Sequence, residues 1–176
     1  MSFVDFSKLT GQALADKMTE NCSSFTNFRL RHPDWIPDLR GARLAGHFGA
    51  LIEVDLNSAL LTEVTMIRGL CLLSNFDFAE MSGSKFHGVN LSGSSLKGIT
   101  AVETDFSGSI LETANLEIAD MRNAILVGAR IFEAKFTGAN LRGANFTGVI
   151  DFHLADFECC DTSGIITSNH VACLRH

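Results

Sequence analysis

At 176 residues the chain is most simply one domain, and it is long enough to bury a sizeable core. Apolar residues make up 46%, which excludes wholesale disorder, and a formal net charge of −6 without a strongly basic segment argues against a charge-driven grip on nucleic acid. The sequence has no apolar run long enough for a membrane span and no recognisable export signal, so we expect a cytoplasmic protein. Its five cysteines lack the spacing of a disulfide framework, which favours reduced thiols.

The N-terminal segment differs in pattern from the rest of the chain. Within residues 5–20, apolar side chains recur near helical spacing, and Ser7 or Thr10 is suited to the N-cap position. These apolar residues are Leu9, Ala13, Leu14 and Met18. The sequence predicts a short helix here that caps one end of the fold, because a repetitive β-structure otherwise exposes its core and its unpaired strand edges.

From residue 54 onward the chain repeats every five residues. In the stretch AKFTGANLRGANFTGV, residues 134–149, a small residue, a polar residue and a large apolar residue recur three times. We call the large apolar residue the centre of its unit. The centres keep one phase through nineteen units: Leu56, Leu61, Met66, Cys71, Phe76, Met81, Phe86, Leu91, Leu96, Ala101, Phe106, Leu111, Leu116, Met121, Leu126, Ile131, Phe136, Leu141 and Phe146. A mostly small residue stands two positions before each centre, and Gly is frequent two positions after it.

A period of five fits neither an α-helix, with 3.6 residues per turn, nor a flat strand, with a side-chain period of 2. It fits a chain in which each unit forms one short side and one turn, so that four units close a square coil of about twenty residues. Coils stacked at ~4.8 Å would direct the centre and the small residue inward. Gly at the corner would relieve backbone crowding. The sequence therefore predicts an all-β solenoid.

The stretches ANLRGANFTG and ADMRNAILVGARIFEAKFTG resemble the pentapeptide repeat family, whose pattern is A-(D/N)-L-x-x. The resemblance covers at least residues 54–148. It implies that the solenoid is a right-handed quadrilateral β-helix.

Two changes of phase locate irregular coils. After Phe146 the pattern is restored by Phe152 and Phe157, which indicates one inserted residue in a bulge near residues 149–151. Upstream, Leu39 and Leu44 are centres, and the stretch GHFGA that follows holds about two extra residues. Still earlier, Phe25 and Leu30 are five residues apart and suit a first coil.

We therefore divide the chain into three parts: an N-terminal cap segment, residues 1–36, the pentapeptide repeat β-helix, residues 37–163, and a C-terminal cap or tail, residues 164–176.

The cysteines and histidines near the C-terminus are the best candidates for metal chemistry, because thiolate and imidazole are ligands that zinc prefers. They are Cys159, Cys160, His170, Cys173 and His176. Their spacing matches no closed zinc site, and Cys160 occupies an inward small position where a thiol fills core space. We find no catalytic constellation or phosphate-cradling loop, and a filled coil interior offers no evident pocket. We expect no enzymatic activity, no metal and no cofactor.

The outward positions carry apolar residues on two adjoining sides. One side collects Leu70, Leu72, Leu73, Ile110 and Phe132, and the next adds Ile67, Ile125 and Val127. Contiguous apolar surface of this kind is typically covered or used for binding. We expect the stripe near residues 60–73 to lie beneath the N-terminal segment. Ile110, Ile125, Val127 and Phe132 are harder to cover in this way and are the partner-binding candidates.

The leading hypothesis is a non-catalytic interaction or regulatory protein, a rigid rod that presents its sides to a protein partner and binds neither nucleic acid nor membrane. Partner identity and oligomeric state are left open, a homodimer included. The alternative comes from the resemblance, because some pentapeptide repeat proteins mimic B-form DNA, bind type II topoisomerases such as gyrase and protect them from quinolones. That activity implies a dense acidic surface and a dimerising C-terminal helix. Residues 74–148 hold eight acids against six bases, from which we expect near-neutral sides. An effector role in a host or developmental pathway is a third reading.

Overall fold

The computed structural model describes residues 9–20, 25–26, 38–45 and 51–168. Its elements in chain order are α1 (Gly11–Glu20), β1 (Phe25–Thr26), β2 (Arg43–Ala45), β3 (Leu51–Ile52), β4 (Thr65–Ile67), β5 (Lys85–His87), β6 (Asn145–Phe146), the 3-10 helix η2 (Phe152–Leu154) and β7 (Ile166–Thr167). All of the strand pairs are parallel, namely β1 with β3, β2 with β4, β4 with β5, and β6 with β7.

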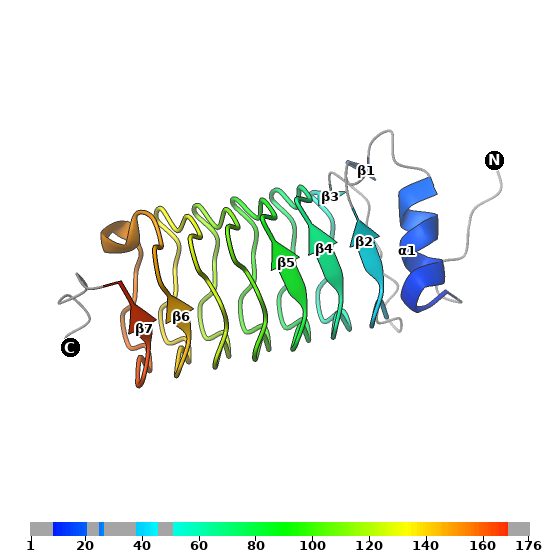
Figure 1. Ribbon diagram of the computed structural model, residues 1–176. Coiled ribbons are helices and arrows are strands. Elements are labelled where there is room, and N and C mark those ends of the chain that lie inside the picture. The colour runs from blue at the N-terminus through cyan, green and yellow to red at the C-terminus, as the bar shows by residue number, and fades with distance from the viewer. Residues whose placement is uncertain (1–8, 21–24, 27–37, 46–50, 169–176) are drawn as a thin grey trace.

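The chain winds as a stack of coils, with single parallel bridges between residues twenty positions apart (Figure 1). Asp55 pairs with Asn75, Asn75 with Ser95, and Ser95 with Asn115. The backbone bonds run from coil to coil: Leu56 N donates to Asn75 O at 2.7 Å, and Asn75 N donates to Val54 O at 2.8 Å. Each five-residue unit is thus tied to the coils before and after it.

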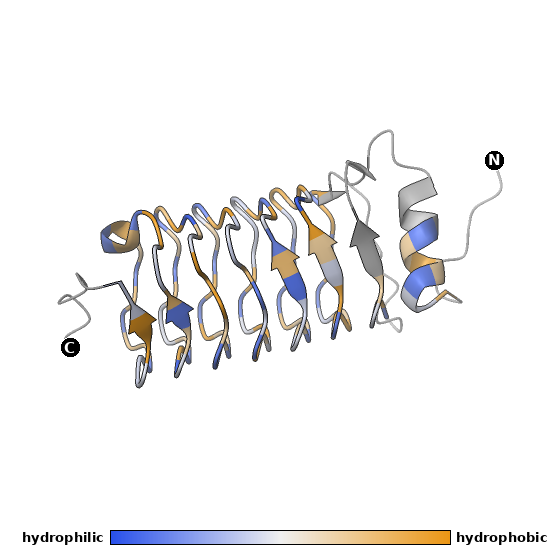
Figure 2. Cartoon of the chain, in the orientation of Figure 1, coloured by the Kyte–Doolittle hydropathy of each residue, from blue (hydrophilic) through white to orange (hydrophobic). Residues whose placement is uncertain are grey.

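Each coil has four sides, which we number by their inward centres. Side 1 holds Leu56, Phe76, Leu96, Leu116 and Phe136; side 2 holds Leu61, Met81, Ala101, Met121 and Leu141; side 3 holds Met66, Phe86, Phe106, Leu126 and Phe146; side 4 holds Cys71, Leu91, Leu111 and Ile131. All nineteen centres are buried, as predicted. In Figure 2 apolar and polar stretches accordingly alternate along each coil.

The small inward positions are also buried, apart from half-buried Gly69. Five of them carry hydroxyl groups that the interior satisfies: Ser74, Ser84, Ser94, Thr104 and Ser109. For example, Thr104 Oγ1 donates to Met81 O at 2.8 Å. Among the described residues no buried side-chain N or O atom lacks a hydrogen-bond partner. The core therefore accepts a hydroxyl in place of Ala at no cost in unpaired polar groups.

The corners are β-turns whose third residue is left-handed. Ala59 N donates to Leu56 O at 3.0 Å, and Ser58 between them has φ of 58°. Gly occupies this position in many units, but Phe78 and Ile118 adopt the same conformation, with φ of 58° and 52°. A left-handed β-branched residue is uncommon, and its strain is offset here by the bonds on either side of the turn.

The two phase changes lie where the sequence predicted them. Leu44 pairs with Met66, a separation of 22 residues, which confirms two extra residues in the coil that contains GHFGA. At the other end, Arg130 pairs with Ile150 but Lys135 pairs with Asp156, so one residue is inserted between Ile150 and Asp156. The insertion is accommodated by left-handed Asp151 followed by η2. Phe152 then stacks on Phe157 at a centroid distance of 4.6 Å.

Helix α1 lies beside β2 at the N-terminal end of the stack (Figure 1). Gly11 N donates to Asp38 O at 2.7 Å, and Leu14 and Ala15 are buried in the common core. The predicted apolar stripe is wrong at Ala13, which is exposed, whereas Ala15 is buried; the side chain of Met18 lies outside the described residues. The parallel pairing extends from β1 to β7. It therefore includes Phe25, and it continues past residue 163, the predicted end of the β-helix.

Candidate interaction surfaces

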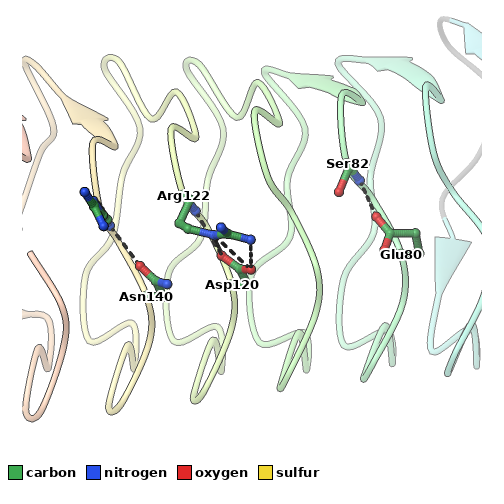
Figure 3. A network of polar contacts seen from close by, with 6 residues as sticks. Glu80, Ser82, Asp120, Arg122 and Asn140 are labelled. Atoms are coloured by element: carbon green, nitrogen blue, oxygen red, sulfur yellow. Dashed lines mark hydrogen bonds and ion pairs between the residues drawn. The ribbon is translucent and has the colours of Figure 1, made fainter.

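A polar residue precedes most centres because its side chain closes the turn that follows. On side 2, Glu80 Oε1 accepts from Ser82 N at 3.0 Å, Asp120 accepts from Arg122, and Asn140 Oδ1 accepts from Arg142 N at 3.2 Å (Figure 3). Asx side chains commonly accept from the backbone two residues on. The repeat pattern predicts only a polar residue at this position, although the frequent Asn and Asp there indicate the hydrogen bond.

The Asp120 carboxylate also forms an ion pair with the Arg122 guanidinium, with Nη2 and Oδ2 2.8 Å apart. This contact holds the pKa of Asp120 below its usual value, and Arg40 does the same for Asp38 at the N-terminal end of side 2. Lys97 reaches one coil further on side 1 to Glu117, at 2.9 Å, and lowers the pKa of that carboxyl. These pairs are exposed, so each contributes little to stability on its own.

The coil register sorts the charges by side. Within residues 74–148, sides 1 and 2 carry five carboxylates against four cations, and sides 3 and 4 carry three against two, so all sides of these coils are close to neutral. Between residues 54 and 163, sides 1 and 2 carry ten carboxylates, Asp55, Glu63, Asp77, Glu80, Glu103, Glu117, Asp120, Asp156, Glu158 and Asp161, against four cations, Lys97, Arg122, Lys135 and Arg142. Sides 3 and 4 carry Asp105, Glu112, Glu133 and Asp151 against Arg68, Lys85 and Arg130. Over this longer range the negative charge gathers on sides 1 and 2, mainly in the coils before residue 74 and after residue 148.

Sides 3 and 4 instead collect exposed apolar side chains. Ile125 and Val127 on side 3 are each 38% exposed, and Phe132 on side 4 is 37% exposed. Ile110, the fourth predicted residue, is only half-buried rather than exposed and pairs with Arg130 in the next coil. The patch is extended by exposed Ile150, which pairs with Arg130.

The apolar stripe near residues 60–73 is not buried as expected. Ile67, Leu70 and Leu73 are exposed, whereas Leu72 is half-buried. Most of the segment expected to cover them lies outside the described residues. Phe78 and Ile118, at the corner between sides 1 and 2, are also exposed. The repeat pattern predicts Gly at this corner position and therefore did not indicate them.

The cysteines among the described residues are free. Burial raises the pKa of Cys71 to about 12, and it is also the main reason that the pKa of Cys160 rises to about 11. Cys160 Sγ donates to Phe136 O at 2.8 Å, which fits its predicted role as core filler. No group of three or more His, Cys, Asp or Glu suited to a metal ion occurs in the described part of the chain, and His170, Cys173 and His176 lie outside it.

Within the described ranges, no helix has the length and apolar character needed to cross a bilayer.

Comparison with known proteins yields one family. The model of pentapeptide repeats matches in eight copies, over residues 55–98, 102–138 and 124–161. No curated protein matches the chain.

Among solved structures, the chain is similar to the pentapeptide repeat protein Rfr23 of the cyanobacterium Cyanothece, at 31% identity over 57% of this chain and 60% of that one, with a TM-score of 0.40. A pentapeptide repeat protein of the Arabidopsis thaliana thylakoid lumen is 26% identical over 55% of this chain and 63% of that one, with a TM-score of 0.41. The chain thus spans less than two thirds of both proteins. QnrB1, a plasmid-mediated fluoroquinolone resistance protein, is 18% identical over 82% of this chain and 77% of that one, with a TM-score of 0.51.

Proposed function

Because the chain belongs to the pentapeptide repeat family, we propose that it is a non-catalytic rod that binds a protein partner in the cytoplasm. Its coils form a right-handed quadrilateral β-helix, the fold that the family is known for, and α1 caps the N-terminal end. The cap is supported by burial of Leu14 and Ala15 and by the bond from Gly11 N to Asp38 O. We propose the division into residues 1–36, 37–163 and 164–176, with parallel pairing that continues into β1 and β7 on either side of the central part.

The observation that carries this proposal is the apolar patch formed by Ile110, Ile125, Val127 and Phe132. Ile125, Val127 and Phe132 belong to one coil, and left-handed Gly128 forms the corner between them. Between residues 125 and 132 the charged residue is Arg130, which is engaged by Glu112 at 2.7 Å, and exposed Glu133 follows Phe132. A surface of exposed aromatic and branched side chains with few free charges is typical of a protein interface core.

The proposal is tested by affinity capture from native lysate with three forms of the protein. Phe132→Asp places a charge in the patch, whereas Asn140→Asp adds the same charge on side 2 and keeps the acceptor for Arg142 N. We expect a partner that the wild type and Asn140→Asp retain and that Phe132→Asp loses, with equal melting temperatures for all three. A partner set unchanged by Phe132→Asp contradicts the assignment of the patch.

A second candidate, a DNA mimic that binds a type II topoisomerase, is favoured by the acidic sides 1 and 2. The charge density speaks against it. Ten carboxylates less four cations leave six net charges over more than five coils, roughly one per 4–5 Å, whereas duplex DNA carries one per ~1.7 Å. We therefore expect no protection of gyrase from quinolones in a supercoiling assay at equimolar concentration. Protection would favour this second candidate over the first.

A further inference from the structure

The corner between sides 1 and 2 carries a motif that recurs every second coil. Residues 77–80 (DFAE), 117–120 (EIAD) and 158–161 (ECCD) each place a corner residue and a small residue between two acids. The motifs are 40 and 41 residues apart, which equals two coils because of the residue inserted after Ile150. The coils between them have KGIT and TGAN at these positions, with a corner Gly and no acid. The five-residue period alone does not require this alternation.

The corner residues of the motif form an apolar ridge. Phe78 is 57% exposed and Ile118 is 56% exposed, although both occupy the left-handed conformation that suits Gly. The Phe78 ring leans over Gly98, with Cε1 2.7 Å from the place of a β-carbon there. Ile118 lies between the neighbouring coils: its Cδ1 is 3.7 Å from the position of a β-carbon on residue 98, and its Cγ2 is 3.4 Å from that of a β-carbon on residue 138. The two side chains are thus fixed along one line rather than scattered.

Carboxylates flank this ridge on both sides. On side 1, Asp77 accepts from Ser95 Oγ at 2.5 Å and from Lys97 N at 3.0 Å, and Glu117 pairs with Lys97. On side 2, Glu80 and Asp120 lie two residues beyond Phe78 and Ile118 and are held by Ser82 and Arg122. These partners fix the carboxylates in place, so the apolar line runs between two ordered rows of carboxylates. Lys97 and Arg122 pair with Glu117 and Asp120, and the net negative charge is located at Asp77 and Glu80 beside Phe78.

We propose that this corner is a docking ridge for a basic amphipathic helix of a protein partner, a surface separate from the apolar patch on sides 3 and 4. The carboxylates beside the ridge favour Lys and Arg on the helix, and the exposed Phe78 and Ile118 favour apolar side chains between these cations. The spacing selects the helix: two coils measure ~9.6 Å, close to the ~10.5 Å that seven helical residues span. Successive side chains on one face of a strand are only ~6.7 Å apart, so the side chains of a bound strand would not match the spacing of the ridge residues.

The test uses a labelled synthetic helix with Leu at every seventh position and Lys or Arg beside each Leu, about 15 residues long so that it spans ~21 Å. A peptide of the same composition in scrambled order is its control. Binding to the full chain is followed by fluorescence anisotropy. Phe78→Gly with Ile118→Gly removes the ridge by installing the residue that this corner already uses at Gly98 and Gly138. Circular dichroism and melting verify the fold of each variant.

Leu73→Gly is the matched variant. Leu73 is also a left-handed corner residue, is 61% exposed and leans over Gly93 at 2.7 Å, but its neighbours Leu72, Ser74 and Asn75 carry no charge. We expect the Phe78/Ile118 double variant to weaken binding at least about tenfold, and Leu73→Gly to leave it unchanged. Asp77→Asn with Glu80→Gln should weaken binding and reduce its salt dependence.

Absence of binding to the wild type overturns the proposal. Equal binding of the scrambled peptide also overturns it, because binding would then depend only on the net charge of the peptide. Equal weakening by Leu73→Gly overturns it as well, because any exposed apolar corner residue would then serve. Since Phe132 lies outside the ridge, Phe132→Asp should bind the peptide like the wild type. A failure of the apolar patch is therefore distinguishable from a failure of the ridge.

Discussion

The Phe78 ring lies across Gly98, one coil further along the same corner, with its Cε1 atom 2.7 Å from where a β-carbon on residue 98 would be. Leu73 stands in the same relation to Gly93, and the Asn123 side chain lies over Gly143. A large left-handed corner residue is thus accommodated by a Gly twenty residues later. These glycines are therefore needed for two reasons: their φ is positive, and the neighbouring side chain occupies the space of a β-carbon.

The first prediction concerns this pairing. Gly98 has φ of 63°, and an added methyl group would also meet the Phe78 ring. We expect Gly98→Ala to lower the free energy of unfolding by about 2 kcal/mol, of which about 1 kcal/mol is left-handed strain. Urea denaturation measures the difference.

Gly108→Ala is the control for this prediction, because Gly108 has φ of 64° but nothing within 4 Å of the added carbon. It should cost only the strain, about 1 kcal/mol. In a Phe78→Gly background, the loss of free energy of unfolding caused by Gly98→Ala should fall to the same value, about 1 kcal/mol. Equal costs for Gly98→Ala and Gly108→Ala in the wild-type background would show that the Phe78 contact is immaterial.

The second prediction uses Thr113, a β-branched corner residue with φ of 55°. Thr113→Gly should remove about 1–2 kcal/mol of strain and add about 0.5–1 kcal/mol of backbone entropy cost. A net gain of about 0.5–1 kcal/mol in the free energy of unfolding is expected, since Thr113 N still donates to Phe132 O. Ser107→Gly, at a position without positive φ, should instead destabilise by a similar amount. A loss of stability in Thr113→Gly would mean that the corner is not strained.

The third prediction concerns pH. The pKa of Asp120 is lowered in the folded state, chiefly by its hydrogen bond with Arg122. The unfolded chain therefore binds this proton more readily, so the stabilisation is fully present above the ordinary Asp pKa of about 3.9 and is lost as pH falls through the lower folded value. Asp120→Asn should show a smaller drop in melting temperature between neutral pH and about pH 3 than the wild type does.

Arg122→Gln removes the other partner of the pair and should reduce the pH dependence in the same way. The double variant should add little to either single change, because both remove one interaction. An unchanged pH profile in both single variants would mean that the pair does not differ between the folded and unfolded states.

The buried half of each unit could be predicted from sequence because burial follows a strict period, and all nineteen centres were identified in that way. The grouping of charges at one corner could not be predicted, for a different reason. Asp77 and Asp120 look unrelated along the chain, and only the coil register places them on either side of one corner. Phe78 and Ile118 were missed because a left-handed corner predicts Gly. Large residues occupy such corners when a neighbouring coil, twenty residues away, leaves room for them.

The last prediction tests packing inside one coil of side 2. Ile99 stands at a small position and Ala101 at a centre, which reverses the usual sizes, and both are fully buried. Outward Thr100 pairs with Glu80 and Asp120, so residues 99 and 101 belong to the same inward columns as Ala79 with Met81 and Ala119 with Met121. We interpret the reversal as one compensated exchange, because a close-packed interior conserves its volume layer by layer.

Ile99→Ala alone should leave a cavity and cost about 2–5 kcal/mol, and Ala101→Leu alone should overpack the layer and cost about 1–3 kcal/mol. The double variant restores the arrangement of the coils on either side, with Ala next to a large centre, and the added Leu fills the space that Ile99 vacates. It should therefore be less destabilised than the sum of the single variants, a coupling expected between residues in contact. Unfolding midpoints in denaturant for the three variants measure that coupling, and strict additivity would mean that Ile99 and Ala101 do not share one layer of the core.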